Sequence, residues 1–328
     1  MKLAVIGATG LVGETLLAAL AERRFPLETL LPVASAQSAG RSIHWGGQVH
    51  EVMSLDDALA AQPDLAIFAT DKTVSETWVP QFVAIGTTVI DHSTTWRMHP
   101  DHHLIVPEVN GHLIGPADKI IANPNCSTIQ LVMALAPLHK HYGLERLVVS
   151  TYQAVTGSGK QGVAQLMAER RGEAPQGQAY PHPIDLNAIP HIDAFLDNGY
   201  TKEEMKVVNE TQKIFNDPTI RLSVTAVRIP VLGGHALAVN ATLSRAFELD
   251  DVIQLLQEMP GVVVQDDPAS CLYPMPRHAQ HRDEVFVGRL RRDPSQANTL
   301  DLWIVADNLR KGAATNAVQI AEQVLQLT

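Results

Sequence analysis

The sequence predicts an α/β protein of two domains, a parallel sheet covered by helices followed by a domain of the α+β class. Three observations favour this fold class. The chain has 328 residues, more than one hydrophobic core usually serves. Its first part alternates short apolar runs with helix-like segments, and its strands become longer after Cys126. We therefore expect one domain from residues 1–126 with 308–328 and a second from residues 127–307.

Hydrophobic periodicity predicts the elements of the first domain. Residues 2–6 form an apolar run typical of a buried strand, and a glycine turn leads from it into a helix that begins near Leu11. Later segments repeat this order, which is typical of a parallel sheet with helices packed on it. The expected later strands are residues 30–33, 65–69 and 88–90, and the expected helices are residues 56–61 and 73–84.

Longer strands with alternating polarity predict a mixed or antiparallel sheet with one covered face in the second domain. A last helix, about residues 309–327, carries apolar side chains at helical spacing, so it could return to pack on the first domain. The expected strands are residues 146–155, 222–228, 236–244, 284–290 and 300–305, and the expected helices are residues 127–142, 202–215 and 251–259.

Composition excludes several classes of protein. A formal net charge of -10 would repel a phosphate backbone, so we expect no nucleic-acid partner. Two cysteines are too few for a disulfide framework, which favours a reducing compartment, the cytoplasm. No apolar stretch approaches the roughly 20 residues that span a bilayer, so no membrane partner is expected. The histidines near His102 lack the ordered spacing of a zinc site, so we expect no metal.

A glycine-rich turn follows the first strand and opens the first helix, which is the context of a dinucleotide-binding motif. Glycines let the backbone approach a pyrophosphate, and a helix N-terminus favours its negative charge. The spacing is G-x-x-G-x-x-G, so a turn needed only for packing is the alternative. The turn reads Gly7, Ala8, Thr9, Gly10, Leu11, Val12, Gly13.

The end of the second predicted strand indicates which dinucleotide binds. Enzymes that use NAD usually place an acidic residue there against the ribose hydroxyls. This chain has no Asp or Glu in that stretch, and its hydroxyls and Arg41 suit a 2′-phosphate, so NADP is favoured. A polar turn without a role in binding is the alternative. The residues concerned are Ser35, Gln37 and Ser38.

Cys126 follows Asn125 at a point where an irregular segment enters a helix. Because helix N-termini stabilise anions, a thiolate forms more easily there and can act as a nucleophile. A buried inert cysteine is the alternative. His235 is the best placed proton acceptor, and Arg228 before it can hold a carboxylate with its fork of donors. The alternative for this pair is a hairpin with a surface arginine and an incidental histidine.

Further polar residues are weaker candidates when taken singly. Gln153 ends a predicted strand before a glycine turn, which allows it to project into the same cleft. Glu203 and Lys206 are one helical turn apart, and a simple surface pair is the stronger interpretation of that spacing.

Together these segments resemble the aspartate-semialdehyde dehydrogenase family over nearly the whole chain. The resemblance is specific because it covers several motifs in order, including the glycine turn, the Asn125-Cys126 pair and residues 307–312 near the end. It implies a glyceraldehyde-3-phosphate-dehydrogenase-like fold, in which a Rossmann-type domain completed by the C-terminal helix joins a catalytic domain that forms a homodimer. Relatives usually carry an arginine where this chain has Gln37.

The resemblance also implies roles for individual residues. Cys126 would form an acyl thioester, with His235 as acid and base and Gln153 beside the thioester. Arg228 would bind the substrate carboxylate and Glu203 its amino group. The residues implied at the phosphate are Lys206, Arg97 and Asn125, and those implied at the cofactor, beyond the glycine turn and Ser35 to Ser38, are Thr156, Gly157 and Asn308.

The implied reaction is the NADPH-dependent conversion of L-aspartyl 4-phosphate to L-aspartate 4-semialdehyde and phosphate, in lysine (diaminopimelate), threonine, methionine and isoleucine biosynthesis. One alternative is an N-acetyl-γ-glutamyl-phosphate reductase, but an acylated nitrogen has no charge for Glu203 to meet. Another is a non-catalytic paralogue that keeps the fold for binding or assembly. The joint presence of Cys126, Gln153 and His235 disfavours the second alternative.

Overall fold

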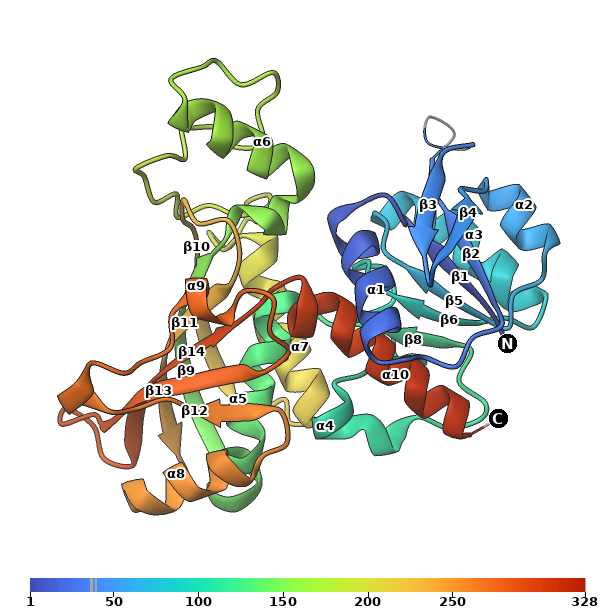
Figure 1. Cartoon of the computed structure of the whole chain (residues 1–328). Coiled ribbons are helices and arrows are strands. Elements are labelled where there is room, and N and C mark those ends of the chain that lie inside the picture. Colours follow the sequence, from blue (N-terminus) through green and yellow to red (C-terminus); the bar gives the residue numbers. More distant parts are fainter. Residues whose placement is uncertain (36–37, 39, 328) are drawn as a thin grey trace. The chain divides into compact units, whose positions relative to one another are not determined.

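A computed structural model describes residues 1–35, 38 and 40–327 of the chain. It divides into two compact units (Figure 1). Unit 1 is Met1–Pro124 with Ala313–Thr328, and unit 2 is Asn125–Gly312. This division differs from the expected ranges at both junctions, because Cys126 and Asn308, which we placed in the first domain, belong to unit 2. Cys126 does so because it begins a helix, α5 (Cys126–Tyr142), that packs on the sheet of unit 2.

The sheet of unit 1 is parallel throughout, in the order β2-β1-β5-β6-β8-β7. Its strands are almost wholly buried because helices cover both faces, which the alternation of apolar runs predicted. Short β7 and β8 and the helical turn α4 (Pro107–Asn110) are additions to the expected elements. The strands are β1 (Lys2–Ile6), β2 (Thr29–Val33), β5 (Leu65–Phe68), β6 (Thr88–Asp91), β7 (His103–Leu104) and β8 (Ile120–Ala122).

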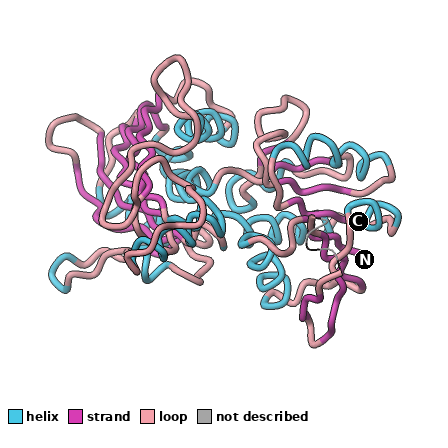
Figure 2. Tube along the Cα trace, turned by 90° about the horizontal axis from the view of Figure 1, so that it is seen from above, coloured by secondary structure: helices cyan, strands magenta, loops and turns pink. Residues whose placement is uncertain are grey.

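Successive residues of β1 supply two separate cores, one on each face of this sheet. Leu3 and Val5 pack with helices α1 (Leu11–Glu22) and α10 (Thr315–Gln326). Ala4 and Ile6 pack on the other face with residues of α2 (Leu55–Ala60) and α3 (Lys72–Ala84). The last helix thus returns to the first domain as expected, after a π-helical turn at Arg310–Ala314. Figure 2 shows helices on both sides of the strands in this unit.

A small hairpin of unit 1 was not predicted. Strands β3 (Ser42–Trp45) and β4 (Gln48–Glu51) pair in antiparallel fashion around Gly46 and Gly47. Both glycines have positive φ, 59° and 76°, as the tight two-residue turn of a hairpin requires. The Gly-Gly pair was therefore a sequence signal for this element.

Unit 2 contains a mixed sheet in the order β10-β9-β11-β14-β13-β12. Strand β9 runs parallel to β10 and antiparallel to β11, as the alternating sequence allowed. Because β9 lies between them, β10 and β11 do not form the hairpin that was considered for Arg228 and His235. The strands are β9 (Leu144–Gln153), β10 (Arg221–Arg228), β11 (His235–Leu243), β12 (Val262–Val264), β13 (Val285–Arg292) and β14 (Thr299–Ala306).

Helices α5, α7 (Lys202–Phe215) and α8 (Leu249–Glu258) pack on one face of this sheet. The opposite face carries partly exposed side chains, among them Tyr152 and Trp303. Helix α6 (Gly159–Arg170) and the turn α9 (Pro276–Ala279) were not expected from the sequence. Within residues 1–35, 38 and 40–327, no helix combines the length and the apolar character needed to cross a membrane.

Candidate active site

Three polar residues meet at one edge of the sheet of unit 2. Gln153 is the last residue of β9, Arg228 is the last residue of β10, and His235 is the first residue of β11. Arg228 pairs with Gln153 in the parallel register, and Ala236 pairs with Tyr152 in the antiparallel one. The opposite directions of β9 and β11 therefore bring the end of one strand to the start of the other. Gln153 and His235, which are 82 positions apart in the chain, thus become neighbours.

The candidate nucleophile is the first residue of α5. Asn125 caps this helix, and its Oδ1 accepts hydrogen bonds from the backbone N–H groups of Ser127 at 2.9 Å and Thr128 at 3.4 Å. Cys126 is partly exposed at the helix N-terminus, where the helix dipole favours a thiolate. A Cβ on Gly312 would lie 3.1 Å from the Cβ of Cys126, so the chain after β14 passes close to this cysteine.

Glu203 of α7 links Asn125, at the start of α5, to Gln153, at the end of β9. Its Oε1 accepts a hydrogen bond from Asn125 Nδ2 at 2.9 Å and another from Gln153 Nε2 at 3.1 Å. Its Oε2 lies 3.1 Å from Lys206 Nζ, which also contacts Asp193 Oδ2 at 2.8 Å. The Glu203 and Lys206 pair is therefore not the simple surface pair that its spacing suggested, since Glu203 is only 6% exposed.

Glu203 and Lys206 each stabilise the charged form of the other. Burial alone would raise the pKa of the Glu203 carboxyl, but the Lys206 ammonium and hydrogen bonds from Asn125 and Gln153 lower that pKa to about 2. Burial would likewise lower the pKa of Lys206, but the carboxylates of Glu203 and Asp193 raise it. The structure therefore presents a carboxylate and an ammonium side by side at neutral pH.

His235 is fully buried beside this group. The backbone N–H of Ala154 donates a hydrogen bond to its Nδ1 at 3.0 Å, and its Nε2 lies 3.5 Å from Gln153 Nε2. Burial, and then the charge of Arg228, lower the pKa of the imidazole to about 3. The ring is therefore neutral at physiological pH, the form that can take up a proton.

Arg228 places a buried positive charge next to the imidazole. Its side chain donates from Nη1 to the carbonyl oxygen of Ala154 at 2.6 Å and lies over the ring of Tyr180 at 5.9 Å. Within the described residues its buried Nε has no hydrogen-bond partner. A Cβ on Gly157 would lie 2.7 Å from Arg228 Nη1 and 3.3 Å from His235 Nε2, so this glycine keeps space open between them. A buried arginine with an unmet donor suits a carboxylate ligand.

Two further expected residues lie at the same edge of unit 2. The side chains of Thr156 and Asn308 are hydrogen-bonded at 3.1 Å. Asn308 Oδ1 also accepts from the backbone N–H of Gly234 at 3.2 Å. The residues expected at the cofactor from this unit therefore contact the turn that leads into His235.

The remaining expected residues belong to unit 1. Gly7 has φ +87°, and a Cβ there would lie 2.4 Å from the carbonyl oxygen of Ala69, while a Cβ on Gly13 would lie 2.1 Å from the carbonyl oxygen of Gly7. Helix α1 begins at Leu11, with Val12 in its first turn, and its N-cap residue is Gly10, which has no side chain. Backbone as crowded as this fits a pyrophosphate at the helix start.

Residues after β2 and β6 complete the expected set in unit 1. Ser35 and Ser38 share a turn, in which the N–H of Ser38 donates to the carbonyl oxygen of Ser35 at 2.8 Å. Gln37 lies outside the described residues. Arg97 is 8% exposed and donates to the carbonyl oxygen of His92 at 2.6 Å. In the described part of the chain, no three His, Cys, Asp or Glu side chains form a group suited to a metal ion.

Sequence reasoning missed two acidic residues at this site. Asp193, which contacts Lys206, lies in a loop with φ 67°, and its position gave no periodic signal. Glu210 is 1% exposed and accepts a hydrogen bond from the backbone N–H of Asn125 at 2.7 Å. It lies seven residues after Glu203, so its place on the same helix face was a signal that could have found it.

Models of the semialdehyde dehydrogenases match both parts of the chain. The NAD binding domain matches residues 2–117, and the dimerisation domain matches residues 135–311. Together with the parallel sheet of unit 1 and the cysteine at the start of α5, these matches define a semialdehyde dehydrogenase with a glyceraldehyde-3-phosphate-dehydrogenase-like fold.

Relatives that match almost the whole chain indicate which semialdehyde dehydrogenases it is similar to. Aspartate-semialdehyde dehydrogenase of Aquifex aeolicus is 45% identical over 99% of this chain and 98% of its own length, and that of Legionella pneumophila is 46% identical over 98% and 95%. The crystal structure of aspartate semialdehyde dehydrogenase II from Vibrio cholerae, complexed with ASA, has a TM-score of 0.95 at 42% identity and covers 99% of this chain and 98% of that one. The chain belongs to the aspartate-semialdehyde dehydrogenase family.

Proposed function

We propose that this chain catalyses the NADPH-dependent reductive dephosphorylation of L-aspartyl 4-phosphate to L-aspartate 4-semialdehyde, through a thioester on Cys126. The observation that carries the proposal is the hydrogen-bonded sequence from Asn125, beside the cysteine, through Glu203 to Gln153, whose amide nitrogen lies 3.5 Å from His235 Nε2. This network supports the proposal because it joins the residue before Cys126 to a buried carboxylate and brings both close to a neutral imidazole. Its pathway would be the biosynthesis of lysine, threonine, methionine and isoleucine, in the cytoplasm.

The substrate would be held by charges at both ends. Arg228 has an unmet donor, Nε, for the α-carboxylate, and Glu203, whose pKa is about 2, offers a negative charge to the ammonium group. Lys206 and Arg97 would neutralise the phosphate and so improve it as a leaving group. Holding both ends converts a collision into an oriented attack on the acyl carbon.

Cys126 would then attack as the thiolate favoured by the start of α5. Its sulfur forms a bond to the acyl carbon, the oxyanion collapses, and phosphate leaves with the electrons of the broken C–O bond. His235 takes the thiol proton and returns it when the aldehyde is released, while Gln153 lies beside the thioester. NADPH, when bound, supplies the hydride that reduces the thioester carbonyl.

Each unit carries residues that we propose for cofactor binding. The crowded glycine turn from Gly7 to Gly13 leaves room for a pyrophosphate, since a Cβ at either end would meet backbone. Ser35 and Ser38 are proposed at the ribose phosphate, and Gln37 belongs to the same proposal. Thr156, Gly157 and Asn308 are proposed toward the nicotinamide. NADP is preferred over NAD because no acidic residue follows β2.

A second function, reduction of N-acetyl-γ-glutamyl phosphate, is less well supported. Its acylated nitrogen carries no charge, whereas Glu203 is ionised by its neighbours. Burying that carboxylate against a neutral amide would leave its charge unmatched. The aspartyl substrate, with a free ammonium group, fits the site better.

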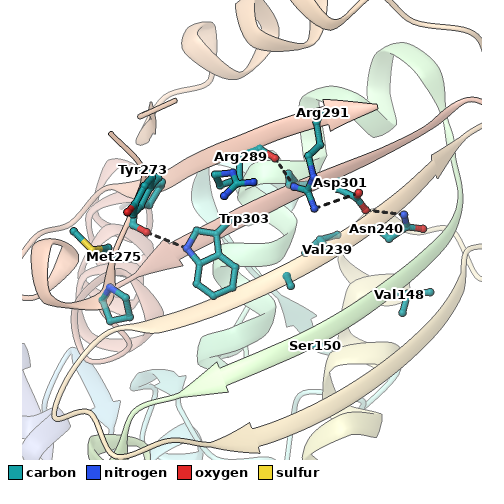
Figure 3. Close-up of a pocket in the computed structure, with 14 residues that line it drawn as sticks. Val148, Ser150, Val239, Asn240, Tyr273, Met275, Arg289, Arg291, Asp301 and Trp303 are labelled. Atoms are coloured by element: carbon teal, nitrogen blue, oxygen red, sulfur yellow. Dashed lines mark hydrogen bonds and ion pairs between the residues drawn. The ribbon is translucent and has the colours of Figure 1, made fainter. Parts of the chain in front are cut away.

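We also propose that the homodimer forms through the face of the unit 2 sheet that lies opposite helices α5, α7 and α8. We call this the open face. A pocket of about 510 Å³ lies on this face, lined by aromatic, aliphatic and charged side chains (Figure 3). Trp303 lies there beside Tyr152, with ring centroids 5.3 Å apart, and Arg291 is paired with Asp301 at 3.3 Å. Exposed aromatic and arginine side chains are enriched at protein interfaces. The dimerisation-domain match covers all of these residues.

The cysteine provides the direct test. The substitution Cys126→Ala removes only the sulfur nucleophile. It should therefore abolish turnover and leave NADPH binding and thermal unfolding unchanged. The assay would follow NADPH formation from the semialdehyde with phosphate or arsenate, using NADP or NAD in parallel. Trapping of radiolabelled substrate on the wild-type chain, followed by peptide mapping, should locate the label on Cys126. Substantial turnover by the alanine variant would overturn the assignment.

A further inference from the structure

Helix α7 holds Asn125 at two separate points. Glu203 and Glu210 are seven residues apart, two turns of helix, and therefore share a face. Glu203 Oε1 accepts from the side-chain amide of Asn125 at 2.9 Å, and Glu210 Oε2 accepts from its backbone N–H at 2.7 Å. One residue is thus fixed through both its side chain and its main chain by carboxylates of one helix.

The orientation of Asn125 determines where α5 begins. Its Oδ1 accepts from the backbone N–H groups of Ser127 and Thr128, so its side chain closes the first turn of the helix. Cys126 follows it directly and is the first helical residue. A rotation of Asn125 would therefore move the thiol and weaken the helix start that favours a thiolate.

Burial makes the contact with Glu210 difficult to replace. Glu210 is 1% exposed and Asn125 is 6% exposed, so loss of the carboxylate would leave a buried N–H group without this acceptor. The charge also has a cost, because a carboxylate near the thiol opposes thiolate formation. Retaining a charged acceptor there makes sense if it orients the nucleophile.

We propose that Glu210 is a positioning residue for the nucleophile, acting on Cys126 through the backbone N–H of Asn125. This inference rests on the proposed function, since it assumes that Cys126 attacks the substrate. Glu210 contributes geometry, while Glu203 contributes both geometry and charge toward the ligand. Removing Glu210 should therefore slow the chemical step and leave substrate binding nearly unchanged.

The first variant removes the acceptor at similar volume. Glu210→Leu should lower kcat about tenfold, the cost of one buried hydrogen bond, and keep KM within about threefold of the wild-type value. Glu210→Gln keeps an oxygen that can accept from Asn125 and should restore kcat to within about threefold of wild type. Steady-state kinetics on both variants measure this difference.

The second measurement uses the thiol itself, without substrate. The rate of Cys126 alkylation by iodoacetamide is followed against pH, with Cys271 replaced by serine in every protein compared. Glu210→Leu and Glu210→Gln both remove the negative charge, but only Glu210→Leu removes the acceptor. Because the loss of the acceptor weakens the helix start, the midpoint of the alkylation profile should lie at higher pH in Glu210→Leu than in Glu210→Gln. This readout would not respond to a general loss of stability.

Glu204 of the same helix supplies the matched control. It is 7% exposed, and its carboxylate accepts from the backbone N–H groups of Thr201 at 2.7 Å and Ala226 at 2.9 Å. Glu204→Leu thus removes buried hydrogen bonds without touching Asn125. It should lower the unfolding temperature but leave the alkylation midpoint and kcat near the wild-type values.

The outcomes separate this inference from the proposed function. Equal kcat losses in Glu210→Leu and Glu204→Leu, or equal alkylation midpoints in Glu210→Leu and Glu210→Gln, would overturn the role of Glu210. If Glu210→Leu does not fold, Glu210→Ala, which also removes the acceptor, takes its place in both measurements. Failure of substrate to label Cys126 in the wild-type chain would instead overturn the proposed function, and the alkylation profiles would still report on Glu210.

Discussion

At the scale of single residues, the charge state of each buried group at the site depends on burial and on the charges and hydrogen bonds of its neighbours. Glu203 stays ionised although it is buried, because Lys206 and two amide donors stabilise the charge. His235 stays neutral because burial and the nearby Arg228 both oppose a second positive charge. The two buried groups differ because the effects of Lys206 and the amide donors on the pKa of Glu203 exceed that of burial, whereas at His235 the charge of Arg228 adds to burial and together they exceed the opposite effect of Glu203.

The neutral His235 predicts a pH dependence of stability. Its pKa is about 3 in the folded chain, against 6.5 for an ordinary histidine. Between these values the unfolded chain binds a proton that the folded chain does not, so stability is lost as the pH falls below 6.5. Each pH unit in this range should remove about 1 kcal/mol.

Urea unfolding of His235→Gln between pH 6.5 and 4.5 should therefore show a shallower loss of stability than the wild-type chain, by about 1 kcal/mol per pH unit. The ordinary pKa of a glutamate such as Glu203 is 4.5, so protonation of Glu203 in the unfolded chain begins only at the lower end of this window. The same substitution at the exposed His182 serves as the control and should leave the slope unchanged. Parallel slopes for wild type and His235→Gln would mean that the buried imidazole is not neutral.

At the scale of secondary-structure elements, the site depends on where strands and helices begin and end. Gln153, Arg228 and His235 are each the terminal residue of a strand, and Cys126 is the first residue of a helix. Element ends expose polar groups that the interior of a sheet or helix would satisfy. A change that shifts one of these ends should therefore affect function more than a change in mid-element.

The start of α1 in unit 1 offers a test of this kind. A Cβ on Gly13 would lie 2.1 Å from the carbonyl oxygen of Gly7 and 2.7 Å from the Cα of Ala8, both backbone atoms. Gly13→Ala should therefore displace the turn, destabilise the chain by about 1–3 kcal/mol and weaken NADPH binding more than tenfold. Calorimetric titration and thermal unfolding measure the two effects.

Gly115→Ala is the corresponding control. The closest atom to a Cβ there is Asp118 Oδ2 at 3.9 Å, and Gly115 does not have a positive φ. This variant should bind NADPH as the wild-type chain does. If Gly13→Ala also binds normally, the close approach at the turn has no role in holding the cofactor.

At the scale of the whole molecule, the two faces of the sheet in unit 2 have different environments. Helices α5, α7 and α8 cover one face, while the other presents Trp303 and Tyr152 to solvent. Because the strands that carry Arg228 and His235 also form this open face, an association through it would brace the edge of the sheet where the site lies. Assembly and catalysis would then share one sheet.

A charge placed on the open face should prevent the proposed dimer. Ser150 is partly exposed among the residues that line the pocket, so Ser150→Arg adds a buried charge to an interface but little strain to a single chain. Analytical ultracentrifugation should find a monomer for this variant and a dimer for wild type. Gln257→Arg, on the exposed side of α8, should remain dimeric. A dimeric Ser150→Arg would exclude this face as the interface.

Much of the secondary structure could be predicted from local sequence patterns. Strand β1 and helix α7 have the bounds that periodicity predicted, because their apolar spacing alone determines which side is buried. The hairpin β3–β4 and helix α6 were missed, the first because its Gly-Gly signal was overlooked and the second because its helix carries little apolar periodicity. The site residues were nominated by motif and resemblance, since single polar residues have no period.

The sequence by itself determined the two-domain α/β plan, the glycine turn before the first helix and the cysteine at a helix start, because these depend on neighbours in the chain. Only the tertiary structure decided that β9 separates β10 from β11, so that Gln153 lies between Arg228 and His235. It also decided that Glu210 holds the residue before the nucleophile, 85 positions away. Contacts of this kind arise from packing between distant elements, and hydrophobic spacing along one segment carries no information about which polar groups will meet.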